Sequence, residues 1–268
     1  MKNTEIIKKY NAFLVDIWGT IHSGGVLYTN AKTTLKEMMA SGYVILFSNA
    51  PRPILKVEQF LAGLGVFKGE HYHEILTSGQ AFIYYAMENK LKNVFYIGPD
   101  KDLDVLNNTN IDVTQNINSE FDEAIVTGIT NLENIGQDVQ TLERLLEKKR
   151  RLLCLNPDIV VTTKNGMEHC AGELARIYAE MGGKVVYFGK PYKEVYSIAL
   201  NIIKNKVQNP KIVAIGDVME TDILGANLAG IDSIFLKNGV GRERIAKYGL
   251  ESFLFEFECK PTYIIEEL

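Results

Sequence analysis

Residues 13–20 place the strongest constraint on how this chain can fold. The apolar run Phe13-Leu14-Val15 leads directly to the carboxylate of Asp16. Such a run is typical of a strand buried on both faces of a parallel sheet, and ligands of open α/β sheets bind where those strands end. We therefore expect Asp16 to lie at the carboxyl edge of a parallel sheet.

Further apolar runs alternate with segments of helical periodicity. The runs at residues 43–47 and 211–215 stop at Ser48-Asn49 and at Gly216-Asp217, and we expect 211–215 to be the last strongly apolar strand. A repeated strand–helix order predicts right-handed βαβ units and a parallel sheet. Residues 79–187 repeat this order by themselves and predict a second α/β unit. The main helices are expected at residues 31–41, 79–90, 131–151 and 170–181.

Composition narrows the class of protein. The chain has 268 residues, of which 46% are hydrophobic. It can therefore bury the core of one large α/β domain or the cores of two modest domains. A net charge of −4, without Lys/Arg clusters interleaved with aromatic residues, argues against a nucleic-acid partner. Three widely spaced cysteines predict buried thiols in a reducing compartment, not a disulfide framework or a zinc site.

The hydropathy pattern of the sequence predicts the cellular compartment of the protein. No apolar core of signal-peptide length follows Met1, and no 18-residue apolar run occurs later in the sequence. We therefore expect a cytoplasmic protein that has no membrane partner.

Polar residues follow several of the predicted strands, and parallel strands would gather them at one rim. Two carboxylates, Asp16 and Asp217, would repel each other unless a cation lay between them, and Mg²⁺ prefers such oxygen ligands. Lys190 could offset the charge of a phosphoryl group, Ser48 could hydrogen-bond its oxygens, and a carboxylate can act as the covalent relay in phosphoryl transfer. Each residue alone is also compatible with a cap, a turn or a solvated surface; their joint placement at strand ends favours a site.

These residues resemble the motifs of the haloacid dehalogenase (HAD) superfamily. Residues 16–20, Asp-Ile-Trp-Gly-Thr, stand where that superfamily has DxDGT, and residues 216–223 match its GDxxxTDI motif. Ser48-Asn49 and Gly189-Lys190-Pro191 correspond to the second and third motifs. The GAxxAG pattern at residues 225–230 and the Asn-Pro-Asp at 156–158 are similar to class IIA, whose large α/β cap lies between the second and third motifs.

The resemblance implies a fold and a set of roles. It implies a Rossmann-like core of residues 1–78 and 188–268 with an inserted α/β cap of residues 79–187. The substrate would be a small phosphorylated metabolite, and class IIA caps often pair, which would make a homodimer. The implied catalytic residues are Asp16, as nucleophile, and Lys190. Ser48 and Lys190 would hold the phosphoryl group, and Asn49 would line its pocket. Asp16, Asp217 and the Trp18 carbonyl would bind Mg²⁺, with Asp222 supporting the metal site.

Trp18 departs from the family pattern. Phosphatases of the superfamily use the second Asp of DxDGT as the general acid and base, and an indole N–H does not titrate. Loss of such a group typically costs about 10²–10⁴ in rate. His22, in the loop just after, is the nearest titratable replacement, although an ordinary packing role is the competing interpretation.

Three functions remain open on this evidence. The first is a Mg²⁺-dependent phosphatase that forms an aspartyl-phosphate on Asp16 and is slowed by Trp18. The second is a catalytically impaired phosphate- and metal-binding protein with a regulatory or interaction role. The third is a phosphotransferase, or an enzyme that takes its acid from the substrate. A dinucleotide-binding fold is disfavoured, because the first strand does not lead to GxGxxG.

Overall fold

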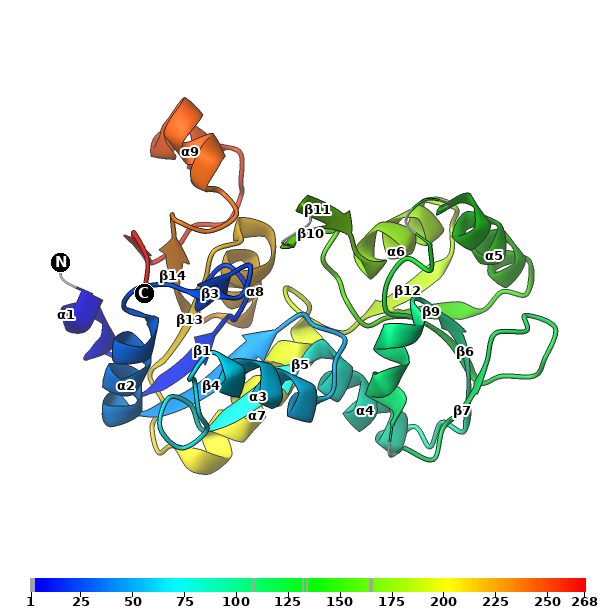
Figure 1. The fold of residues 1–268 in the computed structure, drawn as a ribbon, viewed down its shortest axis with the longest axis horizontal. Helices are drawn as coiled ribbons and strands as arrows, with labels where there is room; N and C mark the ends of the chain where they lie inside the picture. Colours follow the sequence, from blue (N-terminus) through cyan, green and yellow to red (C-terminus); the bar gives the residue numbers. More distant parts are fainter. Residues whose placement is uncertain (1–2, 108, 132, 134, 164–165) are drawn as a thin grey trace. The chain divides into compact units, whose positions relative to one another are not determined.

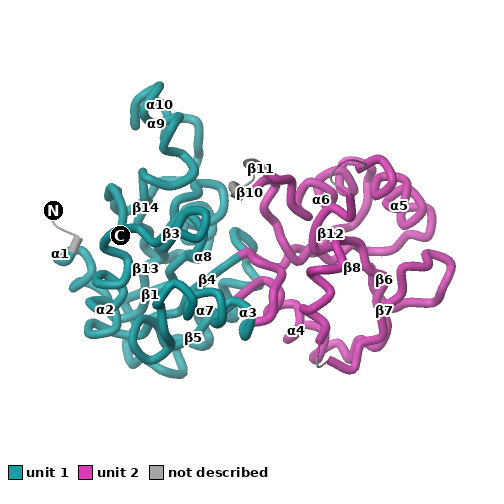
Figure 2. Tube along the Cα trace, in the orientation of Figure 1, with its two compact units in different colours: residues 1–48, 54–76, 190–268 teal, residues 49–53, 77–189 magenta. Residues whose placement is uncertain are grey.

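The computed structural model describes residues 3–107, 109–131, 133, 135–163 and 166–268. The chain forms two compact units, which Figure 2 shows in different colours. The first unit contains Met1–Ser48, Ile54–Leu76 and Lys190–Leu268, and the second contains Asn49–Pro53 and Thr77–Gly189. The domain limits expected from the sequence lay at 78/79 and 187/188, so the short segment 49–53 was not expected to belong with the insert.

The first unit is built on a six-stranded sheet in the order β15-β14-β13-β1-β4-β5 (Figure 1). The pairs β1–β13, β1–β4, β13–β14 and β14–β15 are parallel. A parallel order of this kind needs crossover connections, which the intervening helices supply. The strands are β1 (Ala12–Val15), β4 (Tyr43–Ser48), β5 (Glu74–Thr77), β13 (Ile212–Gly216), β14 (Asp232–Leu236) and β15 (Tyr263–Ile265), and a small antiparallel hairpin joins β2 (His22–Ser23) to β3 (Val26–Leu27).

The central strand is buried on both faces, as its apolar run predicts. Phe13 and Val15 join one core cluster with Leu35 of α2 and Leu61 of α3. Because side chains alternate along a strand, Leu14 points to the opposite face of the sheet. The helices of this unit are α1 (Asn3–Ile7), α2 (Ala31–Ser41), α3 (Ile54–Gly63), α7 (Lys193–Lys206), α8 (Leu224–Ala229), α9 (Arg242–Tyr248) and α10 (Leu250–Phe255), with a π-helical turn at Met219–Ile223.

The second unit has its own parallel sheet, in the order β12-β9-β8-β6-β7. Its core contains Leu152 of β9 together with Leu174 and Tyr178 of α6. The elements are α4 (Ser78–Glu88), β6 (Asn93–Ile97), a 3₁₀ segment (Asp100–Leu106), β7 (Asp112–Thr114), β8 (Glu123–Val126), α5 (Ile135–Glu147), β9 (Arg151–Cys154), β10 (Val160–Thr163), β11 (Gly166–His169), α6 (Ala171–Glu180) and β12 (Lys184–Tyr187).

The α/β fold class is thus confirmed, and two element predictions were wrong. The helix expected over 131–151 is shorter, because Lys149 has a left-handed φ of 54° and β9 begins at Arg151. The strand at 211–215 is not the last, since β14 and β15 follow it in the sheet. No helix in the described part of the chain is both long and apolar enough to cross a lipid bilayer.

Candidate active site

The site lies in the first unit, where three neighbouring parallel strands end. Val15 of β1 is in register with Leu46 of β4 and with Ile215 of β13. The next residues along these strands therefore come level, and the backbone N–H of Asp16 donates to the Ile215 carbonyl at 2.8 Å. Ser48 is the last residue of β4 and is buried.

Lys190 forms the centre of the charge arrangement. Its ammonium nitrogen, Nζ, lies 2.5 Å from Asp16 Oδ1 and 2.7 Å from Asp222 Oδ1, and it also donates to the Phe47 carbonyl at 3.0 Å. All three charged groups are buried. Burial by itself would lower the pKa of Lys190, but the charges of Asp16 and Asp222 outweigh it and raise this pKa above its ordinary value. The ammonium group therefore stays protonated.

Asp217 adds a third carboxylate to the cluster. Carboxylate oxygens of Asp16, Asp217 and Asp222 all lie within 4.8 Å of one another. Burial raises the pKa of Asp217 well above its usual range, and the charges of Asp16 and Asp222 raise it further. One ammonium group does not balance three carboxylates, so the cluster has an excess of negative charge. This donor set, oxygen only and acidic, fits a hard divalent cation.

The Asp217 side chain is held by a loop that follows β14. The backbone N–H of Val240 donates to its Oδ2 at 2.7 Å, and Thr20 Oγ1 donates to its Oδ1 at 3.4 Å. A methyl group at Gly239 would overlap the Asp217 side chain, as would one at Gly19, whose φ of +86° itself favours glycine. The part played by Gly239 and Val240 was not predicted from the sequence, because β14 was not expected and no local pattern links residue 240 to residue 217.

Trp18 and His22 form an aromatic cluster with Phe60 of α3. The indole of Trp18 stacks on the Phe60 ring, with centroids 5.1 Å apart and an interplanar angle of 17°. The imidazole of His22 is fully buried, and its Nδ1 accepts a hydrogen bond from the Gly25 N–H at 3.3 Å. Its Nε2 is buried without a hydrogen-bond partner. Burial lowers the pKa of His22 to about 4, so the imidazole is neutral at pH 7.

Asn49 belongs to the second unit. Its side-chain amide donates to Asp158 Oδ1 at 2.8 Å. Asp158 is the last residue of the Asn-Pro-Asp motif, so two motifs that are distant in the sequence meet within this unit. The structure thus brings Asp16, Lys190, Asp217 and Asp222 together in the first unit, and it brings Asn49 and Asp158 together in the second.

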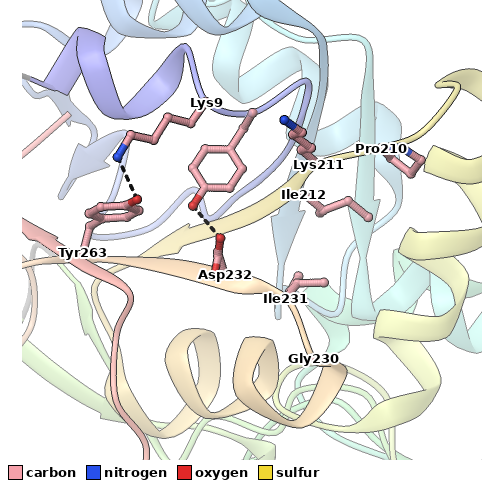
Figure 3. Close-up of a pocket in the computed structure, with 9 residues that line it drawn as sticks. Lys9, Pro210, Lys211, Ile212, Gly230, Ile231, Asp232 and Tyr263 are labelled. Carbon is pink, nitrogen blue, oxygen red and sulfur yellow. Dashed lines mark hydrogen bonds between the residues drawn. The ribbon is translucent and has the colours of Figure 1, made fainter.

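A surface pocket of about 410 Å³ lies at the opposite end of the core strands (Figure 3). Its residues precede or begin β1, β13, β14 and β15. Two hydrogen-bonded pairs of side chains line it: Tyr10 donates to Asp232 Oδ2 at 2.7 Å, and Lys9 donates to the Tyr263 hydroxyl at 3.0 Å. The carboxylate of Asp232 at this end of the sheet thus accepts from a neutral hydroxyl, in contrast to the cluster of three carboxylates around Lys190 at the other end.

Comparison with known proteins agrees with this geometry. Residues 13–112 match a family model described as haloacid dehalogenase-like hydrolase, and residues 187–268 match one described as HAD-hydrolase-like. An acid sugar phosphatase of Staphylococcus haemolyticus is 23% identical over 267 residues, which cover 98% of this chain and 95% of the relative.

Solved structures give the same fold. A haloacid dehalogenase-like hydrolase from Brucella suis 1330 superposes with a TM-score of 0.84 at 27% identity, covering 100% of this chain and 98% of that one. A glycerol phosphate phosphatase from Mycobacterium tuberculosis, solved in complex with calcium, has a TM-score of 0.72 at 19% identity, covering 98% and 74% of the two chains. The chain is a class IIA hydrolase of the haloacid dehalogenase superfamily.

Proposed function

We propose that this hydrolase is a Mg²⁺-dependent phosphatase that acts on a small phosphorylated metabolite through Asp16. The observation that carries the proposal is the buried cluster of three carboxylates around the ammonium group of Lys190. The names of the relatives, an acid sugar phosphatase and a glycerol phosphate phosphatase, support the size and class of the substrate.

Each residue of the cluster has a distinct task in this proposal. Asp16 supplies the carboxylate oxygen that attacks phosphorus, which gives an aspartyl-phosphate that water then hydrolyses. Lys190 and Ser48 hold the phosphoryl oxygens, and Asp222 keeps the Lys190 ammonium group in place. Asp16, Asp217 and the Trp18 carbonyl would bind Mg²⁺, which supplies charge stabilisation for the phosphoryl group when it is bound.

The presence of tryptophan at position 18 determines the rate of phosphate-ester hydrolysis that we expect. Its indole cannot give a proton to the leaving group. His22 is a poor substitute, because its imidazole is neutral at pH 7 and its Nε2 is buried beside aromatic rings. We therefore expect slow hydrolysis of esters whose leaving oxygen needs a proton. The same observation favours a second candidate function, a phosphate- and metal-binding protein that does not turn over.

Phosphate release from a panel of phosphate monoesters, measured with Mg²⁺ and with EDTA, tests the proposal. We expect release that requires Mg²⁺ and is abolished by Asp16→Asn. The control is Asp232→Asn, the same substitution at the opposite end of the sheet, which should leave release unchanged. If only Trp18→Asp releases phosphate and the wild type does not, the binding function is correct; equal release by wild type and Asp16→Asn would refute both roles of Asp16. Homodimer formation and a cytoplasmic location remain predictions from the sequence.

A further inference from the structure

Trp18 lies very close to the proposed nucleophile. Two peptide links separate it from Asp16, so their α-carbons are within about 7 Å of each other. Trp18 as a residue is 38% exposed, although the nearby residues Ile17 and Thr20 are fully buried. A large apolar ring system is therefore partly exposed to solvent, two positions along the chain from the buried Asp16.

The geometry of the aromatic cluster shows where the ring partners of the indole lie. The ring centroids of Trp18, His22 and Phe60 form a nearly equilateral triangle with sides of 4.5, 5.1 and 5.0 Å. Seen from the indole, its two partners thus lie on the same side. In the part of the chain that the structure describes, these are the ring contacts of Trp18. The exposed 38% of this residue is the surface that a ligand can contact.

The cluster also holds the indole in a fixed orientation. Phe60 stacks against one face, and the fully buried His22 packs at a steep angle of 75°. A ring that is held before the ligand arrives loses little side-chain entropy on binding. The exposed part of the indole is therefore a surface on which a planar ligand can stack without reordering the side chain.

Two properties of Trp18 point to the same class of leaving group. An indole face binds flat unsaturated rings by offset stacking. An indole N–H does not titrate, so the leaving group has to depart without a proton from this position. A phenol meets both requirements, because its ring is planar and its oxygen is a stable anion compared with that of an aliphatic alcohol.

We propose that Trp18 determines specificity by stacking on the ring of an aryl phosphate. This inference depends on the proposed function of Asp16. An Asp16 oxygen forms a bond to phosphorus while the bond from phosphorus to the aryl oxygen breaks, and the electron pair leaves with a phenolate, which takes a proton from solvent. Water then attacks the phosphorus of the aspartyl-phosphate, and the bond from phosphorus to the Asp16 oxygen breaks. The water oxygen and both of its hydrogens leave with inorganic phosphate, as dihydrogen phosphate that equilibrates with solvent, and the electron pair of the broken bond restores the Asp16 carboxylate.

Fluorescence can test the binding step without turnover, because Trp18 is the single tryptophan of the chain. In the Asp16→Asn variant with Mg²⁺, phenyl phosphate should change the indole emission in a saturable way. Its Kd should be about 2- to 10-fold lower than that of glycerol phosphate, measured by competition. Equal Kd values for the two esters would overturn the stacking role.

Steady-state kinetics separate stacking from leaving-group chemistry. Trp18→Leu should raise KM for phenyl phosphate about 2- to 10-fold and leave KM for glycerol phosphate unchanged, whereas Trp18→Phe should retain the wild-type KM. Benzyl phosphate has a ring but an aliphatic leaving oxygen, so it should show the KM of phenyl phosphate with a much lower kcat. Phe255→Leu, at a side chain that is 92% exposed, is the matched control and should alter neither constant.

The two proposals fail in different ways. If no ester is hydrolysed, the proposed function is wrong, and the fluorescence titration still decides whether Trp18 binds aromatic rings. If esters are hydrolysed but Trp18→Leu leaves the KM for phenyl phosphate unchanged, the phosphatase function stands and the stacking proposal is overturned.

Discussion

The ammonium group of Lys190 is buried between Asp16 and Asp222, and its removal would leave uncompensated charge in the interior. We predict that Lys190→Met lowers the free energy of unfolding by about 3–5 kcal/mol in EDTA, because breaking a buried ion pair leaves its partners without compensation. Urea denaturation at pH 7.5 measures this loss.

An exposed ion pair in the same unit provides the matched control. Lys237 lies 2.6 Å from Glu266, and the side chain of Glu266 is largely in solvent. Lys237→Met should cost at most about 1 kcal/mol, the usual range for a solvated pair. Similar losses in the two variants would mean that the Lys190 cluster is not the buried, mutually dependent group described above.

His22 should make stability depend on pH in a defined window. Burial lowers its pKa from 6.5 to about 4. The contribution to stability is therefore fully present above pH 6.5 and is lost as the pH falls towards 4, since the unfolded chain takes up the proton first. Between pH 7.5 and pH 5 we expect a loss of about 2 kcal/mol that His22→Asn does not show. Urea denaturation of both proteins at the two pH values checks this; parallel losses would contradict it.

At the scale of single elements, the strands that position the site could be read from the sequence. The apolar runs before Asp16, Ser48 and Asp217 each form a buried strand in the structure. The parallel register of these three strands places their carboxyl ends at the same level of the sheet. An apolar run followed by a polar residue predicts a strand end, because a parallel strand that is buried on both faces is almost entirely apolar until it leaves the sheet.

Other features depend on contacts that no local pattern contains. β15 has three residues at the sheet edge, which is too short for a periodic signal. The turn at Lys149 ended a helix that its leucine spacing would have continued. The bond from Val240 N–H to Asp217 joins residues that are far apart in the sequence, so only the folded chain shows it.

The loop that follows β14 should control metal binding through Asp217. A methyl group in Gly239→Ala would overlap the Asp217 side chain, and the displaced carboxylate would lose the Val240 hydrogen bond. We predict that Mg²⁺ affinity falls about 10- to 100-fold, as is usual when the support of a metal ligand is disturbed. Isothermal titration calorimetry with Mg²⁺ measures this affinity in the variant and in the wild type.

Gly63→Ala is the control for that substitution. Gly63 ends α3, and a methyl group there would meet open space. Its Mg²⁺ affinity should equal that of the wild type. An unchanged affinity in Gly239→Ala would show that Asp217 does not need this loop, or does not bind the metal.

At the scale of the whole molecule, the acidic cluster belongs to one of the two compact units. Asp16, Asp217, Asp222 and Lys190 all lie in the first unit. A ligand that binds only the folded state stabilises the part of the protein that holds its site, by about 2.7 kcal/mol at 100 times its Kd. Saturating Mg²⁺ should therefore protect β1 and β13 from amide hydrogen exchange.

The second unit provides the internal control in the same experiment. β8 and β9 have their own sheet and core, so their exchange rates should change little. Hydrogen-exchange mass spectrometry resolves peptides from both units in one sample. Equal protection of β8 and β13 would contradict the assignment of the metal to the first unit.

Trapping of an acyl phosphate on Asp16 would identify this residue as the nucleophile. Enzyme that is turning over phenyl phosphate with Mg²⁺ is quenched in acid and treated with borohydride, which reduces an aspartyl-phosphate to homoserine. We predict homoserine at position 16 in the peptide mass spectrum, and none in Asp16→Asn or without substrate. Phosphate release with aspartate intact at position 16, or with homoserine at another position, would contradict the account.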